Sequence, residues 1–129
     1  MIEEAPMAVL FTNDLRATAQ FYEKLLGFNA QPYGDGLMML RENMSFLYKP
    51  MRSNSANRGL NVLLRSDNVR QLHKQFHRRG VPIMSELRVV RRAPLSFEVQ
   101  DLNEATLLFV GEERKFTLHQ GGLARQAKK

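Results

Sequence analysis

The sequence predicts an α+β fold made of two βαβββ modules, whose mixed sheets together form a cleft. The order of one strand, one helix and three strands occurs twice, at a spacing of about fifty residues, which indicates a duplicated module. Each expected helix is followed by a glycine, Gly27 or Gly80, a residue that suits the left-handed position after a helix. One module alone would expose an apolar face of a small sheet, so pairing two modules is the physical route to a buried core.

The first module is expected over about residues 7–50. An apolar run at 7–12 predicts a strand, and the side chains of Asn13 and Asp14 can cap the helix that follows. Gly27 then marks the end of this helix. Apolar and small side chains recur at helical spacing before it, at Leu15, Thr18, Ala19, Tyr22, Leu25 and Leu26.

Three strands complete the first module, at residues 28–33, 37–41 and 44–49. The Gly-Asp-Gly sequence at 34–36 supplies the positive-φ positions of a tight hairpin turn. Pro50 ends the last strand because proline cannot donate to a sheet ladder.

The second module is expected over about residues 59–111, after a polar connector at 51–58. A strand at 60–65 precedes a helix that Asp67 or Asn68 caps. The apolar stripe of this helix is formed by Val69, Leu72, Phe76 and Arg79. Three strands are then predicted at 87–92, 95–100 and 105–110, with a turn at Ala93-Pro94 and a basic tail at 112–129.

Composition limits the kinds of chemistry that the chain can perform. Its 129 residues are enough for one domain, and the absence of cysteine excludes disulfides and thiolate ligands. No stretch is long and apolar enough to predict a membrane span, the N-terminus lacks the basic start of a secretory signal, and we expect a cytoplasmic protein. No nucleophile with a partner histidine and no glycine-rich phosphate loop is visible.

The net charge of +6 is concentrated in one part of the chain. Residues 65–92 contain eight basic and two acidic side chains, so this segment accounts for the whole net charge. Such a segment favours an anionic partner, either a nucleic acid, a phosphate or an acidic small molecule. The alternative is a basic face that only keeps the protein in solution.

Several segments resemble one protein family. The sequences VLFTNDL at 9–15, FY at 21–22 and LLGF at 25–28 are similar to the opening of vicinal oxygen chelate proteins, the superfamily of glyoxalases, bleomycin resistance proteins and dioxygenases. In the second module, residues 65–81 resemble the corresponding strand and helix, and residues 97–103 resemble the strand that leads into the last turn. The resemblance covers about residues 7–111, and it implies a single glyoxalase-like domain over 1–129 that forms a homodimer.

The positions that hold a metal in this family carry other side chains here. The resemblance implies His or Glu ligands on the first and fourth strands of each module. These positions fall at Met7, at Leu47 (or Tyr48 if the register shifts by one), at Asn61 and at Leu108. Thioether, alkyl and single amide groups do not form a site for a divalent ion. We therefore expect no metal, no cofactor and no catalytic residue. These expectations disfavour enzymatic activity but do not exclude it.

The resemblance also predicts a ligand-binding cleft, because strand alternation turns every second side chain towards it. Arg65 is the most informative of these side chains, since a cation in an apolar cleft should meet a carboxylate, a phosphate or the anionic group of a ligand. Glu98 is the alternative, structural partner of Arg65. The predicted ligand-binding residues are Phe11, Leu47, Tyr48, Asn61, Arg65, Glu98 and Leu108.

His73 and His77 are spaced by four residues on the second predicted helix and share one of its faces. Two imidazoles at this spacing can bind a metal, but the sequence offers no obvious third ligand. We therefore expect both histidines to be solvated.

Three hypotheses for the function follow. The first is a metal-free small-molecule-binding protein, similar to the bleomycin resistance proteins that sequester a drug, with an anionic or aromatic ligand. The second is a metal-dependent lyase, isomerase or dioxygenase of the same superfamily. The third is a nucleic-acid or regulatory interaction through the basic segment 65–92.

Overall fold

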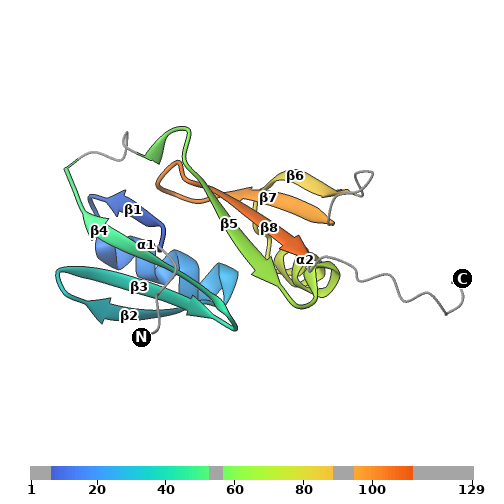
Figure 1. Ribbon diagram of the computed structural model, residues 1–129, viewed down its shortest axis with the longest axis horizontal. Coiled ribbons are helices and arrows are strands. Elements are labelled where there is room, and N and C mark those ends of the chain that lie inside the picture. The colour runs from blue at the N-terminus through green and yellow to red at the C-terminus, as the bar shows by residue number, and fades with distance from the viewer. Residues whose placement is uncertain (1–6, 53–56, 89–94, 112–129) are drawn as a thin grey trace, which may run out of the picture.

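The computed structural model describes residues 7–52, 57–88 and 95–111. Over these residues the chain forms two four-stranded mixed sheets with a helix packed on each (Figure 1). The predicted α+β fold of two βαβββ modules is confirmed. Residues 112–129, which include the expected basic tail, lie outside the described residues. No described helix is both long and apolar enough to span a bilayer.

The first sheet has the strand order β1-β4-β3-β2, with β1 parallel to β4 and the other pairs antiparallel. Its helix, α1, begins after Asp14, whose side chain accepts a hydrogen bond of 3.0 Å from the backbone N–H of Ala17. The predicted cap is therefore confirmed. The elements of this module are β1 (Val9–Thr12), α1 (Leu15–Phe21), the π-helix η1 (Tyr22–Leu26), β2 (Asn29–Tyr33), β3 (Gly36–Arg41) and β4 (Met44–Pro50).

The second sheet repeats this arrangement, in the order β5-β8-β7-β6, with β5 parallel to β8. The side chain of Asn68, one of the two expected caps, accepts from the backbone N–H of Gln71 at 3.1 Å. The elements are β5 (Asn61–Ser66), α2 (Val69–Arg78), β6 (Ile83–Arg88), β7 (Ser96–Gln100) and β8 (Thr106–Gly111).

Three details of the predicted elements are wrong. The strand expected at 87–92 is β6, at Ile83–Arg88, and residues 89–94 with the expected turn at Ala93-Pro94 lie outside the described residues. Two irregularities in the pairing of β6 with β7 break the simple alternation that would have located this strand. Arg79, which was expected on the apolar stripe of α2, is exposed and lies at the C-terminal cap of the helix.

The third difference is that the first helix ends in a π-helical turn, η1. In each module a glycine follows the helix. Gly27 lies one residue further from its helix N-cap, Asp14, than Gly80 lies from its own N-cap, Asn68. A π-helical turn accommodates one extra residue within a helix.

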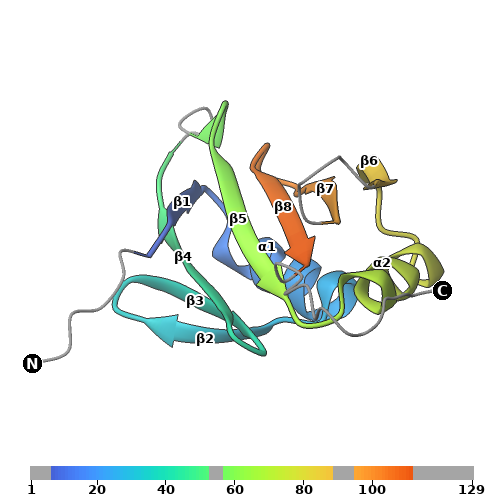
Figure 2. The same cartoon turned by 45° about the vertical axis from the view of Figure 1, so that its right-hand side comes forward.

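Each helix packs on one face of its own sheet, and the apolar core lies between the helix and that face (Figures 1 and 2). Tyr22 and Tyr48 are fully buried in the first module, with ring centroids 5.9 Å apart. Phe76 and Phe109 occupy the corresponding positions on α2 and β8, with centroids 5.3 Å apart. At these equivalent positions the first module therefore carries two hydroxyl groups, and the second carries none.

A carboxylate of the second module accepts hydrogen bonds from these two hydroxyl groups. Asp101 follows β7 and is 6% exposed, and its Oδ2 accepts hydrogen bonds from both Tyr22 and Tyr48. Its Oδ1 accepts from the backbone N–H groups of Asn103 and Ala105, at 2.8 and 3.0 Å. Both oxygens of the Asp101 carboxylate thus accept hydrogen bonds from donors, as a buried carboxylate requires.

Asn57 joins the modules at a second point. It belongs to the segment that was expected to be a polar connector, but its side chain is fully buried. Its Nδ2 donates to the carbonyl oxygens of Phe11, at 2.7 Å, and Asn103, at 2.8 Å, and its Oδ1 accepts from the N–H of Phe11 at 2.9 Å. Asn103 continues this buried network to Thr12, whose hydroxyl donates to its Oδ1 at 3.0 Å. The two modules therefore share a buried polar junction as well as apolar contacts.

Candidate functional site

The face of each sheet that points away from the helices carries most of the predicted ligand-binding residues. We call this surface the open face. In the first module Val9 pairs with Leu47, and in the second Leu63 pairs with Leu108. Because neighbouring strand residues that pair share a face, these registers define the open face on both sheets. Its members include Val9, Phe11, Leu47, Asn61, Leu63, Arg65, Glu98 and Leu108.

The open face is largely apolar and incompletely covered. Phe11 and Leu47 are half-buried in the first module, and Leu108 is half-buried in the second. Leu63, in the middle of β5, is 53% exposed. Exposed apolar side chains grouped on a regular strand surface mark a place where another molecule can bind.

The open face carries two cations, Arg65 and Lys49, the second of which pairs with Phe11. Arg65 is exposed and pairs across the sheet with Val110, whereas Glu98 pairs with Leu108. Among the described residues, neither Arg65 nor Glu98 takes part in an ion pair. The structural pair that the sequence left open is therefore not formed within this part of the chain.

Tyr48 does not lie on the open face. The register pairs Leu47, and not Tyr48, with Val9, so Leu47 occupies the position equivalent to Leu108. The Tyr48 side chain points into the core and donates its hydroxyl hydrogen to Asp101. Burial raises the pKa of Tyr48 well above its usual value of 10.0, and the nearby Asp101 carboxylate adds to the increase. This predicted ligand residue is thus a core residue.

The four family metal positions can be compared directly in the structure. Leu47 and Leu108 occupy equivalent places on β4 and β8, and Asn61 lies two residues before Leu63, as Met7 lies two residues before Val9. Alkyl, thioether and amide groups line these places, and the amide of Asn61 is the one hard oxygen donor among them. These side chains do not provide the several hard donor atoms that a divalent ion needs.

A separate depression lies at the ends of β1 and β4, and it contains none of the predicted ligand residues. Its lining is Thr12, Asn13, Leu15, Pro50, Met51 and Arg52. We take the open face as the better candidate for a binding surface, because its partly exposed apolar side chains lie on regular strands of both sheets.

The basic segment 65–92 does not form one surface. Arg65 lies on the open face, whereas Lys74 and Arg78 lie on α2, which packs on the opposite face of the same sheet. Arg79 points to the first module, where it donates to the carbonyl oxygen of Leu25 at 3.4 Å. Arg91 and Arg92 fall outside the described residues. A continuous nucleic-acid surface over this segment is therefore not supported by the described residues.

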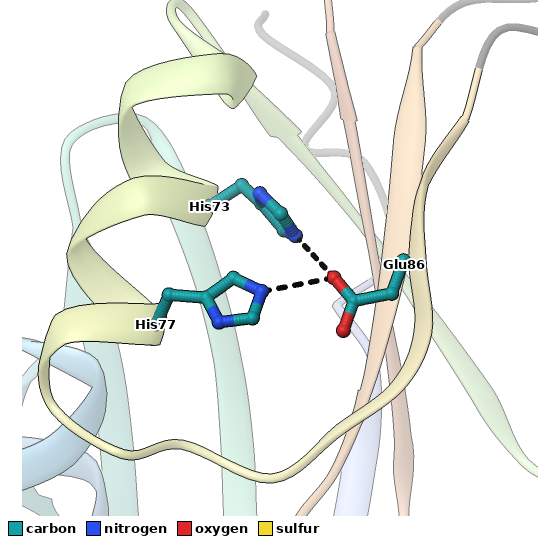
Figure 3. Close-up of side chains that lie close together, drawn as sticks. All are labelled: His73, His77 and Glu86. Carbon is teal, nitrogen blue, oxygen red and sulfur yellow. Dashed lines mark hydrogen bonds and ion pairs between the residues drawn. The ribbon is translucent and has the colours of Figure 1, made fainter.

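His73 and His77 have a third ligating side chain beside them, contrary to expectation. Glu86 of β6 accepts hydrogen bonds from both imidazoles (Figure 3). These hydrogen bonds, from His77 and then from His73, lower the pKa of Glu86 below its usual value of 4.5. The sequence did not indicate this contact, because the strand was expected at 87–92 and Glu86 lay outside it.

Two βαβββ modules, each a four-stranded mixed sheet with a helix on one face, define the class of protein to which this fold belongs. The family model of the Glyoxalase/Bleomycin resistance protein/Dioxygenase superfamily matches residues 5–106, and the chain belongs to this superfamily. The resemblance seen in the sequence is thereby confirmed. No curated protein matches the sequence.

Solved structures agree on the fold. A bleomycin-binding protein in complex with bleomycin has 16% identity and a TM-score of 0.73, over 86% of this chain and 100% of its own. The bleomycin resistance determinant encoded on transposon Tn5 has 16% identity and a TM-score of 0.72, over 87% and 100%. The bleomycin-binding protein of Streptomyces verticillus, in complex with copper(II)-bleomycin, has 18% identity and a TM-score of 0.70, over 88% and 100%.

Proposed function

We propose that this protein binds a small molecule on its open face, in the manner of a sequestering resistance protein and without a metal ion at the family metal positions. The observation that carries the proposal is a set of incompletely covered apolar side chains on the open face, beside Arg65, a cation without an ion-pair partner among the described residues. Two of the similar structures are complexes with bleomycin and with copper(II)-bleomycin, and this supports a binding role over a catalytic one.

The chemistry of the open face favours an aromatic or amphipathic ligand with an anionic group. Phe11, Leu47 and Leu108 offer apolar surface to a flat ring system. The guanidinium of Arg65 offers two parallel N–H donors, which match a carboxylate, sulfonate or phosphate. The net charge of +6 also attracts anions over a longer range.

We also propose that two copies of the chain associate and enclose the ligand. Leu63 is 53% exposed on the open face, and covering it with a second copy removes apolar surface from water. A symmetric pair of chains is the commonest oligomer, and it uses the same patch on both copies. Sedimentation should give a species of twice the 14.9 kDa mass of one chain.

Calorimetry with a flat aromatic anion, anilinonaphthalene sulfonate, tests this function, and bleomycin serves as a second probe. Arg65→Ala should weaken binding of the anion by about tenfold, because this change is close to the free energy of one charge-assisted hydrogen bond. The control is Lys74→Ala, which removes a positive charge from α2, on the other side of the sheet. Equal affinities of wild type and Arg65→Ala for the anion would remove Arg65 from the site. Tighter binding of bleomycin than of the anion would contradict the anionic preference.

A further inference from the structure

Two histidines and a glutamate converge at the outer side of the second module. His73 and His77 project from the same side of α2, and Glu86 reaches them from β6 (Figure 3). The Nε2 atoms of His73 and His77 lie 2.8 and 2.9 Å from the same oxygen, Oε1 of Glu86. One ligating atom from each side chain lies within 4.8 Å of the other two. We propose that these three side chains bind a divalent transition-metal ion such as Zn²⁺.

The surrounding structure holds His73 in place for this role. Its side chain is 15% exposed, and its ring packs edge-on against the buried Phe97, with centroids 5.0 Å apart. The ring of His77 contacts that of His73, with centroids 4.6 Å apart. A ligand whose ring is already fixed loses less conformational entropy when an ion binds.

An irregularity in β6 positions the carboxylate. Ile83 pairs with Val99 and Ser85 pairs with Glu98, so Met84 has no partner of its own on β7 and two residues of β6 lie opposite one. This is the two-against-one count of a β-bulge, which redirects side chains. Phe97 faces α2, and Glu86 beside it turns to the same side. The bulge therefore explains why Glu86 meets the two histidines and does not join Glu98 on the open face.

The donor set selects the kind of ion. Two imidazole nitrogens and one carboxylate suit Zn²⁺ and its transition-metal neighbours, whereas Mg²⁺ and Ca²⁺ prefer oxygen ligands throughout. Three protein ligands leave at least one coordination position for water or an exogenous ligand. In tetrahedral Zn²⁺ sites, bonds of about 2.0–2.1 Å separate ligand atoms by roughly 3.3 Å. The nitrogen-to-oxygen distances of 2.8 and 2.9 Å therefore need to open by only about half an ångström.

The local charge moderates the affinity. Lys74 and Arg78 line the same shallow depression as His73 and His77, and both repel a cation. The side chains of His77 and Glu86 are 53% and 61% exposed, so solvent screens part of this repulsion. We expect a dissociation constant in the micromolar range and one ion per chain.

This site is independent of the proposed ligand site. The histidines lie on α2, and α2 covers the face of the sheet opposite to Asn61, Arg65 and Leu108. Metal bound here therefore has no contact with the family metal positions. The metal proposal and the ligand proposal can fail separately, because Arg65→Ala tests one and the variants below test the other.

Calorimetric titration of the full-length, untagged protein with zinc chloride tests the proposal. Wild type should bind one Zn²⁺, and His77→Ala and Glu86→Gln should each weaken binding by at least about tenfold, since loss of a group that only supports a ligand already costs roughly 10–100-fold. Both residues are exposed, so neither change should impair folding. A second readout is the melting temperature, which saturating zinc should raise in wild type but not in Glu86→Gln.

His119→Ala is the matched control, because it removes the third histidine of the chain and leaves the three proposed ligands in place. This variant should bind zinc as wild type does. Wild-type protein that binds no zinc at micromolar concentrations would overturn the proposal. Equal zinc affinities of wild type, His77→Ala and Glu86→Gln would also overturn it, as would loss of binding in His119→Ala.

Discussion

At the scale of single residues, the contact that depends most on long-range structure is the one between two tyrosines and Asp101. Tyr22 and Tyr48 belong to the first module, and Asp101 belongs to the second. Each hydroxyl is buried, so the loss of its acceptor would leave an unsatisfied donor in the core.

Tyr48→Phe should lower the free energy of unfolding by about 1.5–3 kcal/mol, the usual range for a hydrogen bond to a charged group. The ring itself should still fit, because Phe109 fills the corresponding position in the second module. Urea denaturation measures the change. Tyr33→Phe serves as the control, since Tyr33 is 54% exposed and should lose less than about 0.5 kcal/mol. Equal losses in the two variants would show that the hydroxyl of Tyr48 does not stabilise the fold.

Sequence patterns could predict the local contacts of residues but not the distant ones. Asp14 and Asn68 were expected as helix caps, because a capping side chain bonds to the backbone three residues away. Asn57 was assigned to a polar connector, yet its partners Phe11 and Asn103 are each 46 residues away. No local period encodes such a partner. Arg65 could be placed on the cleft side, because alternation along a strand is a local pattern. The contact between Glu86 and the histidines joins a strand to a helix, and it could not be predicted.

At the scale of elements, the end of the first helix depends on a glycine with two neighbouring arginines. Gly27 has φ of 72°, and a Cβ atom built on it would lie 2.1 Å from Nη1 of Arg41. That guanidinium donates to the carbonyl oxygens of Leu26 and Gly27 and, through Nη2, to Gln75 of α2. Arg41 thus links the end of one helix to the other module.

Gly27→Ala should therefore destabilise the fold by more than backbone strain alone. A left-handed non-glycine residue costs about 1–3 kcal/mol, and displacing Arg41 should add roughly 1 kcal/mol or more in lost hydrogen bonds. Gly34→Ala is the control, because Gly34 also has a positive φ, of 59°, but has nothing within 4 Å of an added Cβ. Thermal or urea unfolding of both variants measures the difference. If Gly34→Ala is as unstable as Gly27→Ala, the contact with Arg41 contributes nothing.

The elements themselves were largely predictable, with exceptions that have a physical cause. Strong alternation and clear turns located β3, β4, β5 and β8 to within a residue or so. Strand β6 was misplaced because its bulges interrupt the alternation, while the apolar residues after it resemble a strand. The π-helical turn η1 was not predicted, because an insertion of one residue in a helix leaves no mark in a single sequence.

At the scale of the whole molecule, the buried tyrosines link stability to alkaline pH. Burial and then the Asp101 carboxylate raise the pKa of Tyr22 well above its ordinary value of 10.0, and the same causes act on Tyr48. Unfolding exposes both hydroxyls, which then ionise above about pH 10. The folded state therefore holds more protons than the unfolded state above this pH, so the free energy of unfolding should fall as the pH rises through and beyond 10.

Urea denaturation at a series of pH values between about 8 and 11 checks this prediction. The variant Tyr48→Phe should show a shallower decrease, because it lacks one of the two groups with a raised pKa. Identical slopes in wild type and Tyr48→Phe would mean that Tyr48 does not contribute to the alkaline loss of stability.

The junction at Asp101 also bears on how this duplicated protein can have been assembled. A polypeptide that ended near residue 52 would retain the two tyrosine hydroxyls but would lack their carboxylate acceptor. Separately expressed halves should consequently be poorly soluble when alone, and they should recover a folded complex when mixed. The two halves are therefore not interchangeable, because the tyrosine hydroxyls belong to one half and their carboxylate acceptor belongs to the other.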